Sequence, residues 1–217
     1  MSEQSTPGTS PTLFLSDADV ASLADWPSVV GALAAAYSCR MSEAMVPPRS
    51  MARGDGVWLR SLTAVSPSGG HLGCKLIAAS LRGGYASYLI SLFDQQTAAL
   101  SALIDGNRVT GLRTAGTATL AVDLLAPQKP LRVAVIGSGF EARGALDCLR
   151  TVRDLASVRV FSPTPASRER FALSFLSRGG VKEPGMGGVM APAEPGVKRG
   201  FERFQGCGFL PFLATAF

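Results

Sequence analysis

The sequence of 217 residues predicts an α/β protein in which an N-terminal α+β domain precedes an incomplete Rossmann, or doubly wound, domain. Three observations support this fold class. Short strand patterns fill residues 45–109, a glycine loop joins a strand to a helix at residues 131–142, and a second strand and helix follow it. Alternation of strands and helices is typical of a parallel sheet. We therefore expect domains at residues 13–127 and 128–178.

Two helices are expected at the start of the first domain, after a disordered tail at residues 1–12 that is rich in Ser, Thr, Pro and Gly. Ser16 stands three residues before Asp19, a spacing that indicates a capping box. Pro27 suits the first turn of a second helix, whose apolar side includes Val30 and Leu33.

Strand patterns follow in four stretches that are bounded by turn residues, at 57–62, 73–78, 88–93 and 98–104. They predict a mostly antiparallel sheet. Asp105-Gly106 or Gly106-Asn107 is expected to form a turn. A helical period then runs from Thr110 to Ala126, where Pro127 and Pro130 mark a domain junction.

The glycine loop carries the clearest functional signal. A hydrophobic run from Leu131 to Ile136 leads into Gly137-Ser138-Gly139-Phe140-Glu141-Ala142, which is the G-x-G-x-x-A form of the dinucleotide-binding motif. Gly137 permits a sharp turn, Gly139 lets the backbone approach a pyrophosphate, and Ala142 lets the helix pack closely on the strand. The first helical turn would then present N–H groups to an anion.

A second strand at residues 158–161 and a helix that begins at Pro165 complete a β-α-β-α unit. Residues 179–217 contain 9 Gly and 4 Pro in 39 positions, which predicts an irregular, poorly packed tail. A complete Rossmann domain would need further strands in this segment.

Composition and charge exclude several classes of protein. Hydrophobic residues make up 47% and charged residues 17% of a chain with a net charge of +5, and its Lys and Arg are scattered, so nucleic acid is not an expected partner. The four cysteines form no C-x-x-C pair and His71 is the single histidine, which argues against a zinc site or a His-dependent triad. The polar N-terminus is no signal peptide, and the apolar stretch at residues 26–39 is too short to span a membrane. We expect no membrane partner and a cytoplasmic location.

Several cationic or hydroxyl side chains are candidates for a site. Arg49 follows two prolines and could bind a carboxylate with its planar fork, although a surface charge is the simpler reading. Lys75 lies in an apolar strand, where it either extends from the exposed face or points into a pocket and acts on an imine. Arg113 and Thr114 are expected in the first turn of their helix, where a bound anion would explain a cation and Thr114 could donate to a phosphate.

The end of the second Rossmann strand bears on the cofactor. NAD sites usually place an acidic residue there for the ribose, whereas this chain has hydroxyl residues and a cation. These residues, which would tolerate a 2′-phosphate, are Ser162, Thr164, Ser167 and Arg168. The pattern allows NAD or NADP and slightly favours NADP.

Taken together, these pieces resemble the ornithine cyclodeaminase/mu-crystallin family. They occur in the family's order over roughly residues 13–178, and the Arg-Thr-Ala sequence about 25 residues before the glycine loop is more specific than the loop alone. The matching segments are Phe14–Val20, Val46–Arg49, Gly73–Lys75, Leu92–Asp94, Asp105–Gly116, Gly137–Ala142 and Val160–Pro163.

The resemblance implies a substrate-binding and dimerisation domain followed by a Rossmann domain, a homodimer if the fold is complete, and NAD(P)-dependent chemistry on a small amino acid or cyclic imino acid. Arg49 and Arg113 would bind the substrate carboxylate, and Lys75 would lie at the reacting amine or imine. Thr114 and the loop from Gly137 to Ala142 would hold the cofactor phosphates.

Two departures from the family leave alternatives open. Glu141 stands where the family commonly has Gln, and the family's acidic residue in the second Rossmann half has no counterpart here. The change of pattern near Gly179 suggests a truncated or frame-shifted copy of a longer parent. A catalytically inactive homologue and a crystallin-like binding protein are therefore the alternatives to an enzyme.

Overall fold

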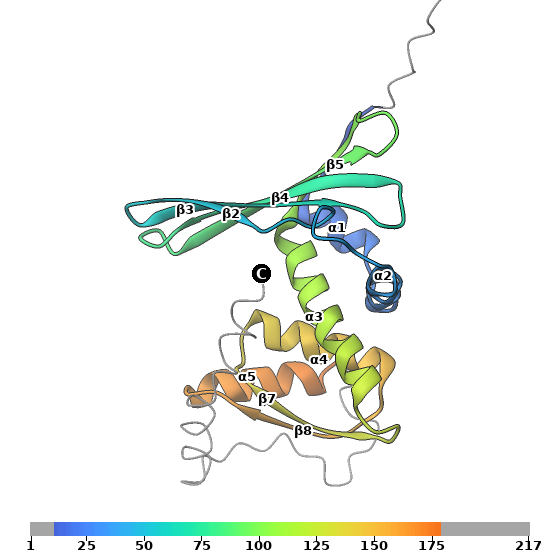
Figure 1. Ribbon diagram of the computed structural model, residues 1–217. Helices are drawn as coiled ribbons and strands as arrows, with labels where there is room; N and C mark the ends of the chain where they lie inside the picture. Colours follow the sequence, from blue (N-terminus) through green and yellow to red (C-terminus); the bar gives the residue numbers. More distant parts are fainter. Residues whose placement is uncertain (1–10, 179–217) are drawn as a thin grey trace, which may run out of the picture. The chain divides into compact units, whose positions relative to one another are not determined.

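The computed structural model describes residues 11–178, so most of the first predicted tail and all of the second lie outside the described residues. The chain divides into two compact units (Figure 1). The first comprises Met1–Ala126 and Gly144–Val152, and the second comprises Pro127–Arg143 and Arg153–Phe217. The predicted domain boundaries differ from this division chiefly at Gly144–Val152, and they stay a prediction.

A six-stranded sheet forms the framework of the first unit, in the order β1-β6-β5-β4-β3-β2. All neighbouring strands are antiparallel except β1 and β6, which run parallel. The mostly antiparallel sheet that the sequence predicts is therefore confirmed. Its strands are β1 (Leu13–Leu15), β2 (Ser50–Gly54), β3 (Val57–Val65), β4 (His71–Ser80), β5 (Tyr85–Asp94) and β6 (Leu100–Asp105).

The two edge strands were not predicted. β1 has three residues, too few for an alternating pattern, and β2 carries Arg53 and Gly54 among its five residues. Both strands depend on pairing with a longer neighbour. Thr12, which the sequence places in the disordered tail, supports β1 because its hydroxyl donates to the Leu100 carbonyl at 3.0 Å.

Three helices of the first unit lie on one side of this sheet (Figure 1): α1 (Asp17–Leu23), α2 (Trp26–Ser38) and α3 (Gly106–Leu125). The predicted capping box of α1 is confirmed, since the Ser16 hydroxyl accepts from the Asp19 N–H while the Asp19 carboxylate accepts from the Ser16 N–H. The Ser16 hydroxyl also donates to the Asp19 carboxylate at 2.6 Å, and this bond, together with the one from the Ser16 N–H, lowers the pKa of Asp19. Pro27 lies in the first turn of α2, as predicted.

The core of this unit forms where α2, α3 and the second half of α4 (Phe140–Val152) meet, through Val30, Ala115 and Cys148. Burial raises the pKa of the Cys148 thiol, and the neighbouring Thr119 hydroxyl acts in the opposite direction. Gly116 permits the close approach, because a Cβ there would come within 2.6 Å of Leu33 Cδ1. The three helices therefore pack as one layer.

The second unit is a β-α-β-α arrangement, as predicted. Strands β7 (Leu131–Ile136) and β8 (Leu155–Phe161) pair in parallel, and α5 (Pro165–Leu176) follows β8. Val158, Val160, Phe171 and Phe175 form its buried centre. Arg153 donates to the carbonyls of Pro127 and Lys129 and so fixes the loop that leads into β7. The fold class predicted from the sequence is confirmed.

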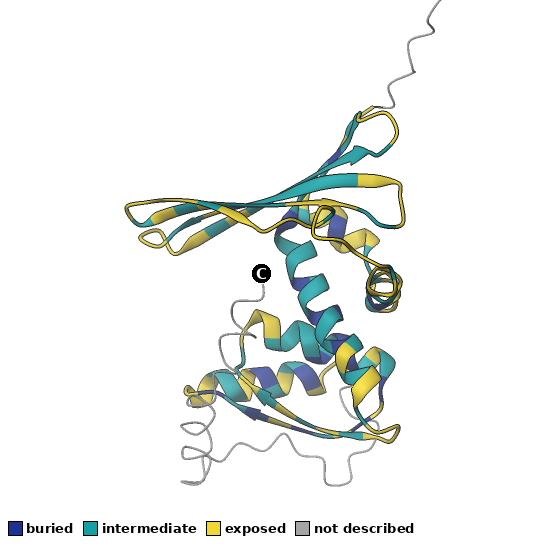
Figure 2. Ribbon diagram, in the orientation of Figure 1, coloured by how far each residue is buried: buried dark blue, intermediate teal, exposed yellow. Residues whose placement is uncertain are grey.

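Burial differs between the two sides of the six-stranded sheet. Figure 2 shows many exposed residues along its strands and buried residues on the helices beside it. In the part of the chain that the structure describes, no single helix has the length and hydropathy to cross a membrane. Taken together, α1 and α2 reach this length and hydropathy, but they are bent by 90° relative to each other.

We expect Gly73→Ala to destabilise the first unit. A Cβ at this position would lie 2.4 Å from the Ser91 carbonyl oxygen of β5, so β4 and β5 would have to move apart. The expected loss is about 1–3 kcal/mol in the free energy of unfolding, measured by denaturant titration. Gly31→Ala is the control, because a Cβ there meets nothing within 4 Å. That helical substitution should stabilise the protein by about 0.5–1 kcal/mol, and equal effects of the two would contradict the packing.

Candidate functional site

Lys75 lies on β4 and points toward α3. Its ammonium donates to the Thr110 hydroxyl at 2.7 Å and lies 5.2 Å from the centre of the Tyr88 ring. The Thr110 hydroxyl in turn donates to the Gly106 carbonyl at 2.5 Å. The side chain therefore belongs to the helix-covered face of the sheet, here called the inner face, and the alternative of a lysine on the exposed face does not hold.

Arg49 directly precedes β2. Ser50, the first residue of β2, pairs with Ser61, and the next residue of β3, Leu62, pairs with Lys75. Two strand spacings, about 10 Å, therefore separate the start of β2 from Lys75. Arg49 itself is exposed.

Arg113 approaches the same region from α3. It follows Thr110 by three residues, a spacing that places both side chains on one side of a helix. One terminal nitrogen of its guanidinium is fully buried. Thr110 thus holds Lys75 on the inner face, Arg113 follows Thr110 by about one turn of α3, and Arg49 directly precedes β2.

The predicted position of Arg113 and Thr114 in a first helical turn is wrong. α3 begins at Gly106 and not near Thr110, so both residues lie about two turns inside the helix. The predicted Asp-Gly turn is wrong for the same reason, since the Asp105 side chain caps the helix by accepting from the Asn107 N–H at 2.9 Å. The Thr114 hydroxyl donates to the Thr110 carbonyl at 2.7 Å. The backbone N–H groups around Thr114 therefore lie in mid-helix, where no free N–H groups of a helix N-terminus could help to bind a phosphate. Phosphate binding by Thr114 stays a prediction.

Thr110 and Tyr88 are contacts of Lys75 that the sequence interpretation missed. Two patterns in the sequence point to these contacts. Thr110 precedes Arg113 by three positions, so the two share one side of a helix, and alternation along β5 puts Tyr88 on one face of that strand. Neither signal could be used without the register of β4 against β5, in which Ile77 pairs with Tyr88.

The glycine loop of the second unit has the predicted strand–loop–helix geometry. Gly137 has a φ of +108°, and its N–H donates to the Phe161 carbonyl at 2.7 Å. α4 begins at Phe140, and the Arg143 N–H donates to the Gly139 carbonyl at 3.2 Å. A Cβ on Gly139 would meet nothing within 4 Å, which leaves space over the first turn of α4. Glu141 is exposed in that turn, and Ala142 is half-buried.

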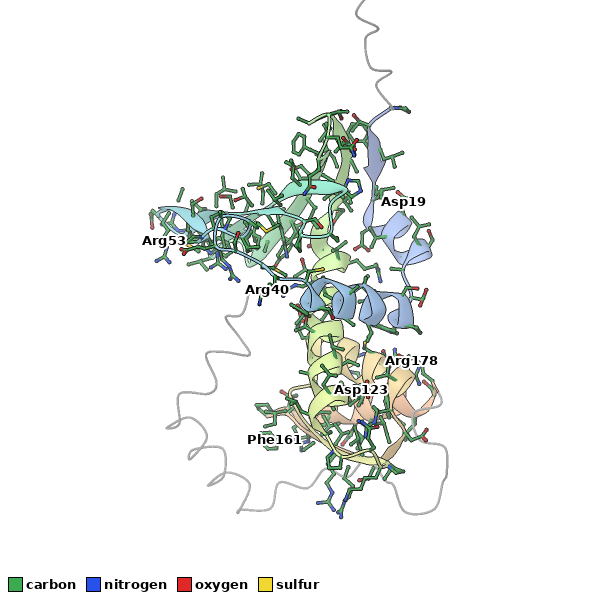
Figure 3. The ribbon with its side chains drawn as sticks, turned by 45° about the vertical axis from the view of Figure 1, so that its right-hand side comes forward. Asp19, Arg40, Arg53, Asp123, Phe161 and Arg178 are labelled. Carbon is green, nitrogen blue, oxygen red and sulfur yellow. The ribbon has the colours of Figure 1, made fainter. Side chains whose placement is uncertain are left out.

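A pair of serines ties this loop to the end of β8. The Ser138 hydroxyl donates to the Ser162 hydroxyl at 3.0 Å, and Ser162 is buried. Arg168 on α5 donates to the Ser162 carbonyl, while Thr164 is exposed just before α5. Phe161 marks this end of β8 in Figure 3. The loop, Ser162 and Arg168 thus meet where the two parallel strands end, which is where nucleotides bind to open α/β sheets.

No group of three or more His, Cys, Asp or Glu side chains in the described residues is placed to hold a metal ion. Cys39 and Cys74 are half-buried thiols, whereas Cys148 is buried. Cys207 lies outside the described residues.

An α+β unit with basic side chains on one sheet face, joined to a strand–glycine loop–helix unit, defines an α/β protein of the dinucleotide-binding class. Comparison with known proteins makes this more specific. Residues 79–182 match the ornithine cyclodeaminase/mu-crystallin family model. The resemblance to this family that the sequence motifs indicate is therefore confirmed over this segment.

The most similar proteins agree with this assignment. The chain is 44% identical over 72 residues to the NAD(P)H-dependent anabolic L-arginine dehydrogenase of Pseudomonas aeruginosa, which covers 33% of this chain and 23% of that protein. It resembles an archaeal alanine dehydrogenase dimer with bound NAD (TM-score 0.70, 24% identity, 78% of this chain and 54% of that one). A probable ornithine cyclodeaminase from Bordetella pertussis gives a TM-score of 0.68 at 24% identity, over 79% of this chain and 54% of that one.

These similarities cover only part of each known protein. At 24% identity, the two solved structures show that this chain shares their fold. The chain spans about half the length of those solved structures and less than a quarter of the arginine dehydrogenase.

We expect Gly137→Ala and Gly139→Ser to differ in stability. Ala at a φ of +108° adopts a strained backbone, so the free energy of unfolding should fall by about 1–2 kcal/mol. Ser at position 139 meets no neighbour within 4 Å and suits the residue before a helix, so its effect should stay within about 0.5 kcal/mol. Denaturant titration measures both, and a Gly139 variant less stable than the Gly137 variant would contradict this loop geometry.

Proposed function

We propose that this protein is an NAD(P)-dependent enzyme that acts on a small amino acid or cyclic imino acid, by cyclodeamination or by imine reduction. The observation that carries the proposal is the Lys75 ammonium, which Thr110 holds on the helix-covered face of the sheet. Guanidinium groups bind carboxylates through paired hydrogen bonds, and an ammonium can donate a proton to an imine nitrogen. The chain also carries a glycine loop of dinucleotide-binding geometry.

Each cation has a distinct role in this proposal. Arg49 and Arg113 bind the substrate carboxylate and fix its orientation. Lys75 hydrogen-bonds the amine or imine nitrogen and supplies or removes its proton. Thr110 positions Lys75, because their 2.7 Å hydrogen bond sets the direction of the ammonium.

The second unit fits a nicotinamide cofactor. Gly137 and Gly139 let the backbone approach the pyrophosphate, and the N–H groups of Phe140, Glu141 and Ala142 point out of the first turn of α4 toward it. The bound cofactor would accept or supply hydride. We propose NADP over NAD, because Arg168 is held at the end of β8 by the Ser162 carbonyl and residues 161–164 include no acid. Ser162, Thr164 and Arg168 would then contact the 2′-phosphate, and Thr114 would remain a candidate phosphate ligand through its hydroxyl alone.

A ligand-binding protein without turnover is the second candidate function. Glu141 lies in the first turn of α4, where a carboxylate repels a pyrophosphate unless the side chain points away. Saturable cofactor binding without turnover would favour this candidate.

We also propose that the chain forms a homodimer through the outer face of its sheet, the face opposite the helices. Alternation along β3 and β5 puts Val57, Leu59, Tyr85 and Leu89 on this face, and all four are exposed. Phe14, whose partner in β6 is Leu103, joins them and is 73% exposed. Large apolar side chains exposed together on one sheet face are typical of a subunit interface.

The enzyme reading predicts that Lys75→Ala abolishes turnover while cofactor binding persists. The assays use the full 217-residue chain: NADPH oxidation with a cyclic ketimine, ammonia release from ornithine, and fluorescence titration with NADPH and NADH. Turnover should fall at least about 100-fold in the variant, and NADPH should bind more tightly than NADH. Lys129→Ala, with an exposed side chain, is the control. Turnover that is unchanged in Lys75→Ala would remove the role of Lys75, and no saturable cofactor binding would remove both functions.

The dimer proposal predicts that Leu59→Glu shifts the protein to monomers in sedimentation velocity, because a buried unpaired carboxylate weakens an apolar interface. Leu173→Glu on α5, an exposed apolar position in the second unit, should leave the oligomeric state unchanged. A wild-type protein that is monomeric at every concentration would contradict this proposal.

A further inference from the structure

The inner face of the sheet carries a cation that the proposed function does not use. Arg60 on β3 pairs with Ile77 of β4, two residues beyond Lys75. Arg60 and Lys75 are therefore diagonal neighbours on the same face, with Cα atoms about 7–8 Å apart. An arginine side chain is long enough to reach a ligand held at Lys75.

The surroundings of Arg60 contain no negative charge. Its cross-strand row on the inner face consists of Met51, Arg60, Ile77 and Tyr88, and the next row outward consists of Arg53, Trp58, Ala79 and Ala86. The row of Lys75 adds Leu62 and Ile90. Within the described residues no Asp or Glu forms an ion pair with Arg60.

Trp58 orients Arg60. The guanidinium carbon lies 5.1 Å from the centre of the Trp58 ring, a cation–π distance, and both side chains come from one face of β3. The neighbouring Arg53 is turned differently, since its Nε donates to Met51 Sδ at 3.0 Å. Figure 3 shows Arg53 at the outer end of the sheet. Trp58 stands in the row beyond Arg60 from Lys75, so the half-buried guanidinium rests over that ring and its side chain must turn back along the strand to reach a ligand at Lys75.

We propose that Arg60 determines substrate specificity by binding an anionic group on the substrate's side chain, so that the site takes dicarboxylic amino or imino acids in preference to neutral ones and disfavours cationic ones. The inference rests on the proposed function, because Arg49, Lys75 and Arg113 must first hold the α-carboxylate and the nitrogen. A guanidinium fork matches a second carboxylate, and a cationic side chain beside Arg60 would meet like charge at short range.

Equilibrium binding to the full chain in the presence of NADPH tests this inference, with L-glutamate, its neutral isostere L-glutamine, and L-ornithine as probes. The wild type should bind glutamate about tenfold or more tightly than glutamine, as a charge-assisted pair predicts, and ornithine least. Arg60→Met keeps an apolar stem over Trp58 and should bring glutamate and glutamine to within about threefold by weakening only glutamate. Arg60→Lys should keep a preference for glutamate, which separates loss of charge from misfolding.

Arg53→Gln is the matched control on the same face and should keep the wild-type order of the three ligands. Glutamine binding as tight as glutamate binding in the wild type, or a glutamate preference that survives in Arg60→Met, would overturn the inference and leave the proposed function intact. If none of the three binds to the wild type, the proposed function fails together with the inference.

Discussion

The start of α3 against strand β5 is the constraint on which the site of the first unit depends. Gly106 is the first helical residue, and a Cβ there would come within 3.0 Å of Tyr88 Cβ and 3.3 Å of Ile90 Cγ1. Because Gly106 lacks that atom and Asp105 caps the helix, β6 passes into α3 without a loop. One turn later Thr110 meets Lys75, and three residues further Arg113 faces the same region. Moving the helix start by one residue would rotate all of these side chains by about 100°.

Local patterns in the sequence predicted much of this fold because their physical causes are local. The capping box at Ser16 and Asp19, the helix that begins at Pro165 and the turn at Gly137 each depend on neighbouring residues. The start of α3 could not be predicted in that way. Asp-Gly-Asn suits a turn and also suits a capped helix, and the choice depends on contact with Tyr88 and Ile90 of a different strand. β1 and β2 could not be predicted for the same reason, because their few residues form strands through pairing with β6 and β3, which are distant in the sequence.

The candidate site shows the same division between local and long-range causes. Arg49, Lys75 and Arg113 were identified by residue type and family motif, but the face of the sheet to which Lys75 points depends on register. A shift by one residue between β3 and β4 would place Lys75 among the exposed apolar side chains of the outer face. The β3–β4 ladder, with nine paired positions, fixes that register. One sheet can therefore present cations on its inner face and an apolar surface of Val57, Leu59 and Leu89 on the other.

The two principal helix ends also explain where an anion can bind. At α3 the Asp105 carboxylate accepts from the Asn107 N–H, so a negative side chain already occupies that helix end. At α4 the residue before the helix is Gly139, which has no side chain to act as an acceptor. A carboxylate thus caps the first N–H groups at α3, whereas at α4 the residue before the helix leaves these N–H groups open and the one negative charge of the first turn is the exposed Glu141. A phosphate is therefore expected at Gly137–Ala142, and the groups around α3 are left to recognise a substrate through side chains alone.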